Sequence, residues 1–184
     1  AGGTIDKIYG EERGTLNFSF GKQAIREMGE NKLKLNVEYD IERLLAKDSL
    51  EMTEEDRQLI KRACQGAIAN KILITHGTDT LHYTAAALSF ILENVPIPII
   101  LVGSQRSSDR PSTDSSLNLI HAARFIKETE FVGVGICMHA TINDDYSYIL
   151  PACKTRKMHT SRRDAFKAIN TSPIAQIGEK IVFI

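Results

Sequence analysis

Residues 71–80 read KILITHGTDT, a short apolar run that passes directly into a polar loop. The run Lys71–Thr75 is nearly continuous rather than alternating, which is typical of a strand buried on both faces in a parallel sheet. Beyond the loop, apolar residues recur at spacings of three and four over Leu81–Asn94, and this predicts a helix. The whole segment is therefore expected to form half of a βαβ unit.

The same alternation of strand and helix continues on both sides of this segment. Upstream, Thr53 precedes three acidic residues and resembles an N-cap, with the helix ending near Asn70. Downstream, the pattern predicts a strand, a loop, a helix and a strand at Pro98–Val102, Gly103–Thr113, Ser115–Ile126 and Phe131–Met138. We therefore expect an α/β fold, a doubly wound, Rossmann-like or flavodoxin-like parallel sheet with helices on both faces.

The composition is that of an ordinary globular protein, and it excludes several classes of function. The 184 residues are 42% hydrophobic, and 23 basic residues balance 23 acidic ones. No net field exists to attract nucleic acid or an anionic membrane, so we expect neither as a direct partner. The longest apolar stretch, Val95–Gly103, is far shorter than the roughly 20 residues of a membrane helix. One domain over residues 1–184 is the expectation.

Cysteine and histidine usage argues against a metal or disulfide framework. Three cysteines lie at wide, irregular spacing, and the five histidines form no HxxxH pair. The first ten residues also lack the layout of a signal peptide. We therefore expect a cytoplasmic protein that uses no metal and no other cofactor.

Polar loops follow the predicted strands, and these are where ligands bind in open α/β sheets. Residues 76–80 and 103–106 lie there. Gly2-Gly3-Thr4 looks like a loop of the same kind, but no residues precede it that could form its strand. We therefore expect the sequence to lack its true beginning, rather than to start with an irregular segment. In the GTDT run, Gly77 permits a close backbone approach, Thr78 offers a hydroxyl nucleophile and Asp79 a carboxylate. The alternative is that these residues only cap the next helix. Gly2-Gly3-Thr4, which would meet GTDT at the same edge of the sheet, favours two threonines that face one substrate.

Five segments together resemble the L-asparaginase family, over nearly the whole chain. They are GGTI (2–5), DSLEM (48–52), ITHGTDT (74–80), PIPIILVGSQR (96–106) and RKMHTSRRDAFKAIN (156–170). The later part is especially similar to the D subunit of the archaeal glutamyl-tRNA amidotransferase, whereas GGTIDKIY and DSLEMT look more like short single-domain asparaginases. The resemblance implies an asparaginase N-terminal type of domain, with the smaller C-terminal domain of the family absent.

The resemblance also implies roles for particular residues. Thr4 matches the threonine that attacks the side-chain amide to form an acyl-enzyme, and Thr78, Asp79 and Lys157 match a second triad on the opposite side of the substrate. Lys157 would act as the base for Thr78. Ser49 and Glu51 match the substrate clamp, in which Ser49 receives the α-carboxylate; Asp79 also resembles the group that receives the α-ammonium.

Two further residues complete the expected site. Backbone N–H groups near Gly77 are candidate oxyanion donors, and Tyr9 is the candidate lid tyrosine because it lies in a glycine-punctuated stretch. Each assignment has a structural alternative. Ser49 and Glu51 could belong to a helix start, Tyr9 could be a packing aromatic, and the basic run 154–167 is expected to lie on the surface except for Lys157.

The function implied by the resemblance is that of an asparaginase-type amidohydrolase. It would convert L-asparagine to the acid and ammonia as a dimer or higher homo-oligomer, with L-glutamine left open as a second substrate. One alternative is an ammonia-generating subunit of a glutamyl-tRNA amidotransferase. Another is a module that binds asparagine or aspartate without turnover.

Overall fold

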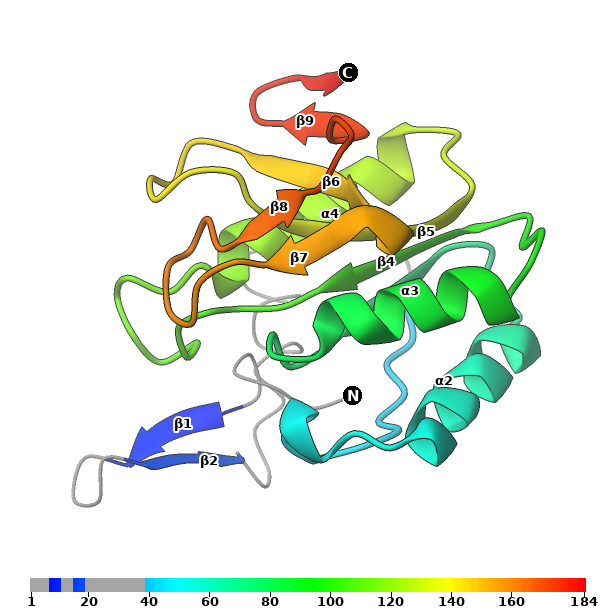
Figure 1. Cartoon of the computed structure of the whole chain (residues 1–184), viewed down its shortest axis with the longest axis horizontal. Helices are drawn as coiled ribbons and strands as arrows, with labels where there is room; N and C mark the ends of the chain where they lie inside the picture. Colours follow the sequence, from blue (N-terminus) through cyan, green and yellow to red (C-terminus); the bar gives the residue numbers. More distant parts are fainter. Residues whose placement is uncertain (1–6, 11–14, 19–38) are drawn as a thin grey trace.

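The computed structural model describes residues 7–10, 15–18 and 39–184, and its centre is a six-stranded sheet (Figure 1). The strand order is β10-β9-β6-β5-β4-β3. These strands span Ile181–Phe183, Ala175–Ile177, Ser147–Pro151, Gly133–His139, Pro98–Val102 and Ile72–Thr75. Two separate hairpins pair β1 (Lys7–Gly10) with β2 (Thr15–Phe18), and β7 (Thr155–Lys157) with β8 (Phe166–Ala168).

The sheet is parallel over β3, β4 and β5, and antiparallel from β6 onward. The α/β fold is confirmed, but the sheet is mixed rather than parallel throughout. Only residues 140–146 connect β5 to β6. A parallel crossover needs a dozen or more residues, so this short connection makes β6 return in the opposite direction.

Helices cover both faces of the sheet, as expected. On one face, α2 (Glu54–Gly66) and α3 (Leu81–Ile91) contribute Ile60 and Leu88 to a core shared with Leu101. On the other face, α4 (Ser115–Glu128) packs Phe125 in a second core with strand residues of alternate orientation. Two short 3₁₀ helices, η2 (Ser49–Glu51) and η3 (Ala152–Lys154), complete the described elements.

Local sequence explains where the helices begin and end. Thr53 caps α2 in a reciprocal capping box with Asp56. The helix ends at Gly66, not near Asn70 as predicted. Ile68, just beyond, is fully exposed, so no core contact supports another helical turn.

Two buried histidines are held neutral by their surroundings. His76, which follows β3, has its pKa lowered to about 4, chiefly by burial. His121 on α4 also has its pKa lowered to about 4, by burial and then by the nearby positive charges of Arg124 and His139. Both rings still find hydrogen-bond partners, because His121 Nδ1 lies 2.9 Å from Ser147 Oγ and His76 contacts Thr84.

These histidines should make stability depend on pH in the mildly acidic range. Each folded-state pKa of about 4 is below the ordinary 6.5, so the unfolded chain takes up protons first as pH falls. The free energy of unfolding should drop by up to about 1.4 kcal/mol per pH unit for each histidine in this window. Urea denaturation across the range measures the slope. The double variant His76→Gln/His121→Gln should flatten it, and a steep slope in that variant would refute the assignment.

Candidate active site

The candidate site lies where β3 and β4 end and α3 begins. The loop 76–80 joins β3 to α3, and the loop 103–114 joins β4 to α4. The β7–β8 hairpin comes from outside the main sheet and reaches the same edge (Figure 1). Three separate segments therefore supply side chains to one place.

The central contact joins Thr78 to Lys157, which are 79 positions apart in the chain. Lys157 Nζ donates to Thr78 Oγ1 at 2.8 Å and to Asp79 Oδ1 at 2.7 Å. Thr78 is buried, and the Lys157 side chain is 9% exposed, whereas Asp79 is 47% exposed. The expected grouping of these three residues is thus present in the geometry, with a carboxylate on the solvent side and the threonine inside.

Ser49 packs directly against Gly77, as their joint place in the expected site requires. A Cβ atom on Gly77 would lie 2.5 Å from Ser49 Cβ and 2.6 Å from its hydroxyl oxygen, so only glycine fits here. Thr80 Oγ1 donates to the Ser49 carbonyl at 2.6 Å and fastens η2 to the loop. Thr80 occupies the N-cap position of α3, but its side chain makes no capping bond.

Glu51 lies on the same 3₁₀ helix as Ser49 but is exposed. Within residues 39–184, no hydrogen bond or ion pair joins its carboxylate to Thr78, Asp79 or Lys157. The η2 helix is itself capped by Asp48, whose side chain accepts from the Leu50 N–H at 3.0 Å. The structure therefore brings Ser49, but not the Glu51 side chain, into contact with the GTDT loop.

His76 and Gly103 fix the remaining sides of this loop. His76 Nδ1 donates to the Gly77 carbonyl at 2.8 Å, because a carbonyl oxygen can only accept. The neutral ring then accepts from the Thr84 hydroxyl through Nε2 at 3.0 Å. A Cβ on Gly103 would lie 2.9 Å from Thr78 Cγ2. Thr78 is thus enclosed by backbone on one side and faces Lys157 on the other.

Several residues that organise the site were missed by sequence reasoning. Asp114, fully buried before α4, accepts from the backbone N–H groups of Gln105 and Arg106 at about 3 Å. Gln105 Nε2 in turn donates to the Arg162 carbonyl at 2.8 Å. An aspartate before a helix usually signals an N-cap, so the sequence offered no sign that Asp114 folds back onto the loop.

Two predicted site residues have side chains that lie outside the described part of the structure. Thr4 lies outside the described residues altogether. Tyr9 lies in β1, where it pairs with Leu16 along the backbone, but its side chain is not among those described. Their assignments stay predictions.

The described residues show neither a metal cluster nor a membrane-spanning helix. Over these ranges, no three His, Cys, Asp or Glu residues group in a way that would hold a metal ion. No helix in the same part of the chain is sufficiently long and apolar to cross a bilayer.

Two relatives of this chain in sequence are named as the same subunit of an amidotransferase. The chain is 55% identical over 113 residues to the D subunit of the glutamyl-tRNA(Gln) amidotransferase of Methanobrevibacter smithii, covering 61% of this chain and 26% of that protein. It is 40% identical over 192 residues to the protein of the same name from Pyrococcus furiosus, covering 100% of this chain and 42% of that protein. The chain thus spans less than half of the length of either relative.

The fold is shared with solved asparaginase structures. The L-asparaginase from Thermococcus kodakarensis superimposes with a TM-score of 0.84 at 30% identity, covering 99% of this chain and 53% of that one. A family model described as "Asparaginase, N-terminal" matches residues 1–184. These findings confirm the resemblance seen in the sequence, and the chain therefore belongs to the asparaginase N-terminal family.

Proposed function

We propose that this chain is an amidohydrolase that cleaves the side-chain amide of L-asparagine through a threonine acyl-enzyme, with L-glutamine tested below as a second substrate. The observation that carries the proposal is the 2.8 Å contact between Lys157 Nζ and the buried Thr78 hydroxyl. A threonine hydroxyl is a weak nucleophile unless a neighbouring base removes its proton. A lysine amine in hydrogen-bond contact with that hydroxyl supplies such a base once it has lost its own proton.

The proposed reaction uses the same proton twice. Lys157 Nζ, in its neutral form, takes the proton from Thr78 Oγ1 as the oxygen attacks the amide carbon. The tetrahedral intermediate collapses when Lys157 returns the proton to the leaving ammonia, and water then hydrolyses the ester. Backbone N–H groups near Gly77 face the developing oxyanion in this scheme. The resemblance gives the first attack to Thr4, and both threonines are therefore replaced by alanine in the test below.

Substrate orientation follows from the charges at the edge of the site. Asp79 is half exposed and receives the substrate's α-ammonium group, while Ser49 receives the α-carboxylate. Lys157 balances the Asp79 charge at 2.7 Å when the site is empty. We propose a cytoplasmic homo-oligomer, with no cofactor, as the working form of this enzyme.

A second candidate is an ammonia-generating subunit of a glutamyl-tRNA amidotransferase. The observation in its favour is the 55% identity to a protein of that name. The two candidates share the same amide chemistry and differ in the destination of the ammonia. A free hydrolase turns over alone, whereas the amidotransferase component requires its partner and charged tRNA.

Removal of the Lys157 amine should abolish ammonia release. We expect Thr4→Ala, Thr78→Ala and Lys157→Met each to lower kcat by about 10²–10⁴-fold, since each deletes a nucleophile or a proton-transfer group. Ammonia release from L-asparagine and L-glutamine, assayed separately, measures the loss and the preferred amide. Lys154→Met is the matched control, because Lys154 is exposed and lies only three residues earlier.

The assay also separates the candidate functions. A folded wild-type chain that releases no ammonia would contradict the stand-alone hydrolase. Release that appears only with partner and charged tRNA would favour the amidotransferase component. Binding of aspartate without turnover in either setting would identify a non-catalytic module.

A methyl group at position 77 should weaken substrate binding. Because the new Cβ would meet Ser49 at 2.5 Å, Gly77→Ala must displace η2 and raise the KM for the amide. Overpacking of this kind should also lower the free energy of unfolding by about 1–3 kcal/mol. Thermal denaturation and steady-state kinetics measure the two effects.

Gly66→Ala provides the matched glycine control. A Cβ at this position, at the end of α2, would meet nothing within 4 Å. This variant should keep the wild-type KM and equal or exceed the wild-type stability, by up to about 1 kcal/mol. A Gly77→Ala protein with the same KM as Gly66→Ala would show that Ser49 does not touch the substrate.

A further inference from the structure

The hairpin that carries Lys157 is built outside the main sheet. β7 pairs only with β8 among the described strands, in a separate two-stranded ladder. Phe166, which pairs with Lys157 in this ladder, is buried in the core, and at the other end the Ile169 N–H donates to the Lys154 carbonyl at 2.8 Å. Lys157, however, is the last residue of β7, and the tip formed by residues 158–165 follows it directly. The position of Lys157 is therefore set by its pairing with Phe166 on one side and by what holds the tip on the other.

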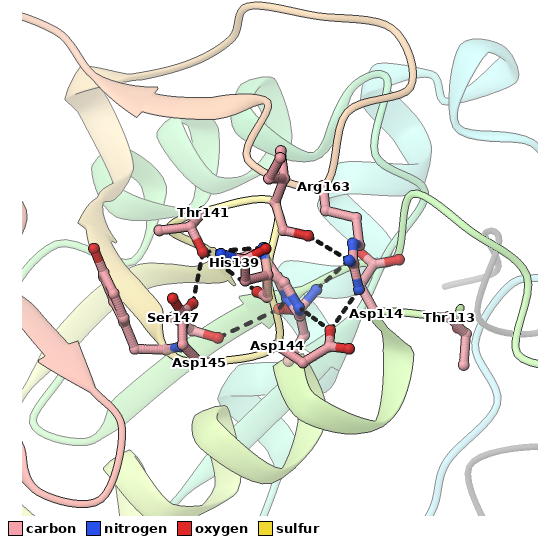
Figure 2. A network of polar contacts seen from close by, with 12 residues as sticks. Thr113, Asp114, His139, Thr141, Asp144, Asp145, Ser147 and Arg163 are labelled. Carbon is pink, nitrogen blue, oxygen red and sulfur yellow. Dashed lines mark hydrogen bonds and ion pairs between the residues drawn. The ribbon is translucent and has the colours of Figure 1, made fainter. Parts of the chain in front are cut away.

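Arg163 ties this tip to the loop between β5 and β6. Its Nη1 donates to Asp144 Oδ1 at 2.5 Å, and its Nη2 donates to the Ile142 carbonyl (Figure 2). The Arg163 side chain is only 15% exposed. The expectation that it lies on the surface with the rest of the basic run is therefore wrong. The neighbouring Arg162 is 55% exposed and pairs with Asp164 inside the tip itself. Of these two arginine side chains, Arg163 is the one that links the hairpin to another segment.

Asp144 also contacts the side chain of His139. The fully buried His139 ring places Nε2 3.2 Å from Asp144 Oδ1 and Nδ1 2.6 Å from Asn118 Oδ1 (Figure 2). The Asn118 amide is fixed in orientation, because its Nδ2 donates to the Gly103 carbonyl at 3.0 Å and to Asp114. A buried network that loses one partner leaves polar groups unsatisfied, so its geometry is stiff.

The two ends of this network both reach the candidate site. At one end, Gly103 lies against the Thr78 side chain. At the other end, Arg163 holds the tip that follows Lys157. The same chain of contacts thus sets the places of the hydroxyl and of the amine that meets it.

We propose that Arg163 and Asp144 are positioning residues that hold Lys157 Nζ against the Thr78 hydroxyl. The inference rests on the proposed function, because it concerns the geometry of that proton transfer. Neither residue touches the reacting atoms. Loss of the ion pair loosens the tip, although Gln105 still binds the Arg162 carbonyl and Ala165 stays buried. The Lys157 amine can then shift while Ser49, Gly77 and Asp79 keep their places. The effect should therefore fall on kcat rather than on KM.

The test compares Arg163→Gln and Asp144→Asn with the control Arg162→Gln. We expect either network variant to lower kcat for ammonia release by about 100-fold with KM within about twofold, since displacement of a catalytic group by an ångström costs that much. The double variant should be no worse than either single one, because both remove the same contact. Guanidinium ions should restore part of the kcat of Arg163→Ala, and Arg162→Gln should match the wild type.

Hydrogen exchange provides a readout that does not depend on turnover. The Met158 N–H donates to the Ala165 carbonyl at 2.7 Å, directly behind Lys157. Its exchange should accelerate at least about tenfold in Arg163→Gln and Asp144→Asn, but not in Arg162→Gln, because local opening governs exchange. Unchanged exchange in the network variants would overturn the inference.

The outcomes separate this inference from the proposed function. If Lys157→Met is inactive but Arg163→Gln has wild-type kcat, positioning by the ion pair is wrong and the proposed chemistry stands. If Lys157→Met is fully active, the proposed chemistry is wrong, and positioning for it falls with it. A loss in Arg163→Gln that appears equally in Arg162→Gln would also overturn the inference, because it would reflect the charge of the tip rather than the tie to Asp144.

Discussion

The contact between Lys157 and Thr78 depends on one reversal of chain direction. β5 ends at the edge where the loops 76–80 and 103–114 lie, and the short connection after it forces β6 to run back across the sheet. β7 then starts near the opposite side and travels again towards the site (Figure 1). Had β6 continued the parallel pattern, the residue at the end of β7 would have been delivered to the far edge of the sheet.

Buried polar groups hold the segments that meet at this edge of the sheet. Burial of a carboxylate or an imidazole is costly unless hydrogen bonds replace water. The Asp114 carboxylate accepts hydrogen bonds from backbone N–H groups, and the His139 ring lies between Asn118 and Asp144. The Asp114 contacts thereby fix the connection that precedes α4, and the His139 contacts join α4 to the loop between β5 and β6.

The sequence predicted the half of the fold whose elements are long and periodic. β4 was expected at its observed bounds, and α3 and α4 differ from expectation only near their C-terminal ends. The α3 segment ends at Ile91, and Asn94, with a φ of 57°, turns the chain away shortly after. The strands β7 to β10 have only three residues each, too few for a period-2 pattern to emerge. Their pairing depends on contacts that are distant in sequence.

The candidate site divides in the same way. The GTDT loop, Ser49 and Lys157 lie in segments that resemble the asparaginase family, and their grouping was predicted through that resemblance. Gln105 and Arg163 carry no local signal, because their roles are to bind a backbone carbonyl or a carboxylate on another loop. Polar residues of this kind look like ordinary surface residues in a sequence.

The separate construction of the β7–β8 hairpin divides the molecule into two modules that can evolve at different rates. The main sheet and its helices bury most of the core, whereas the hairpin tip contributes Ala165 to that core and is otherwise attached by polar contacts at the rim. Substitutions at exposed positions of the tip can therefore shift Lys157 with little change in the free energy of unfolding.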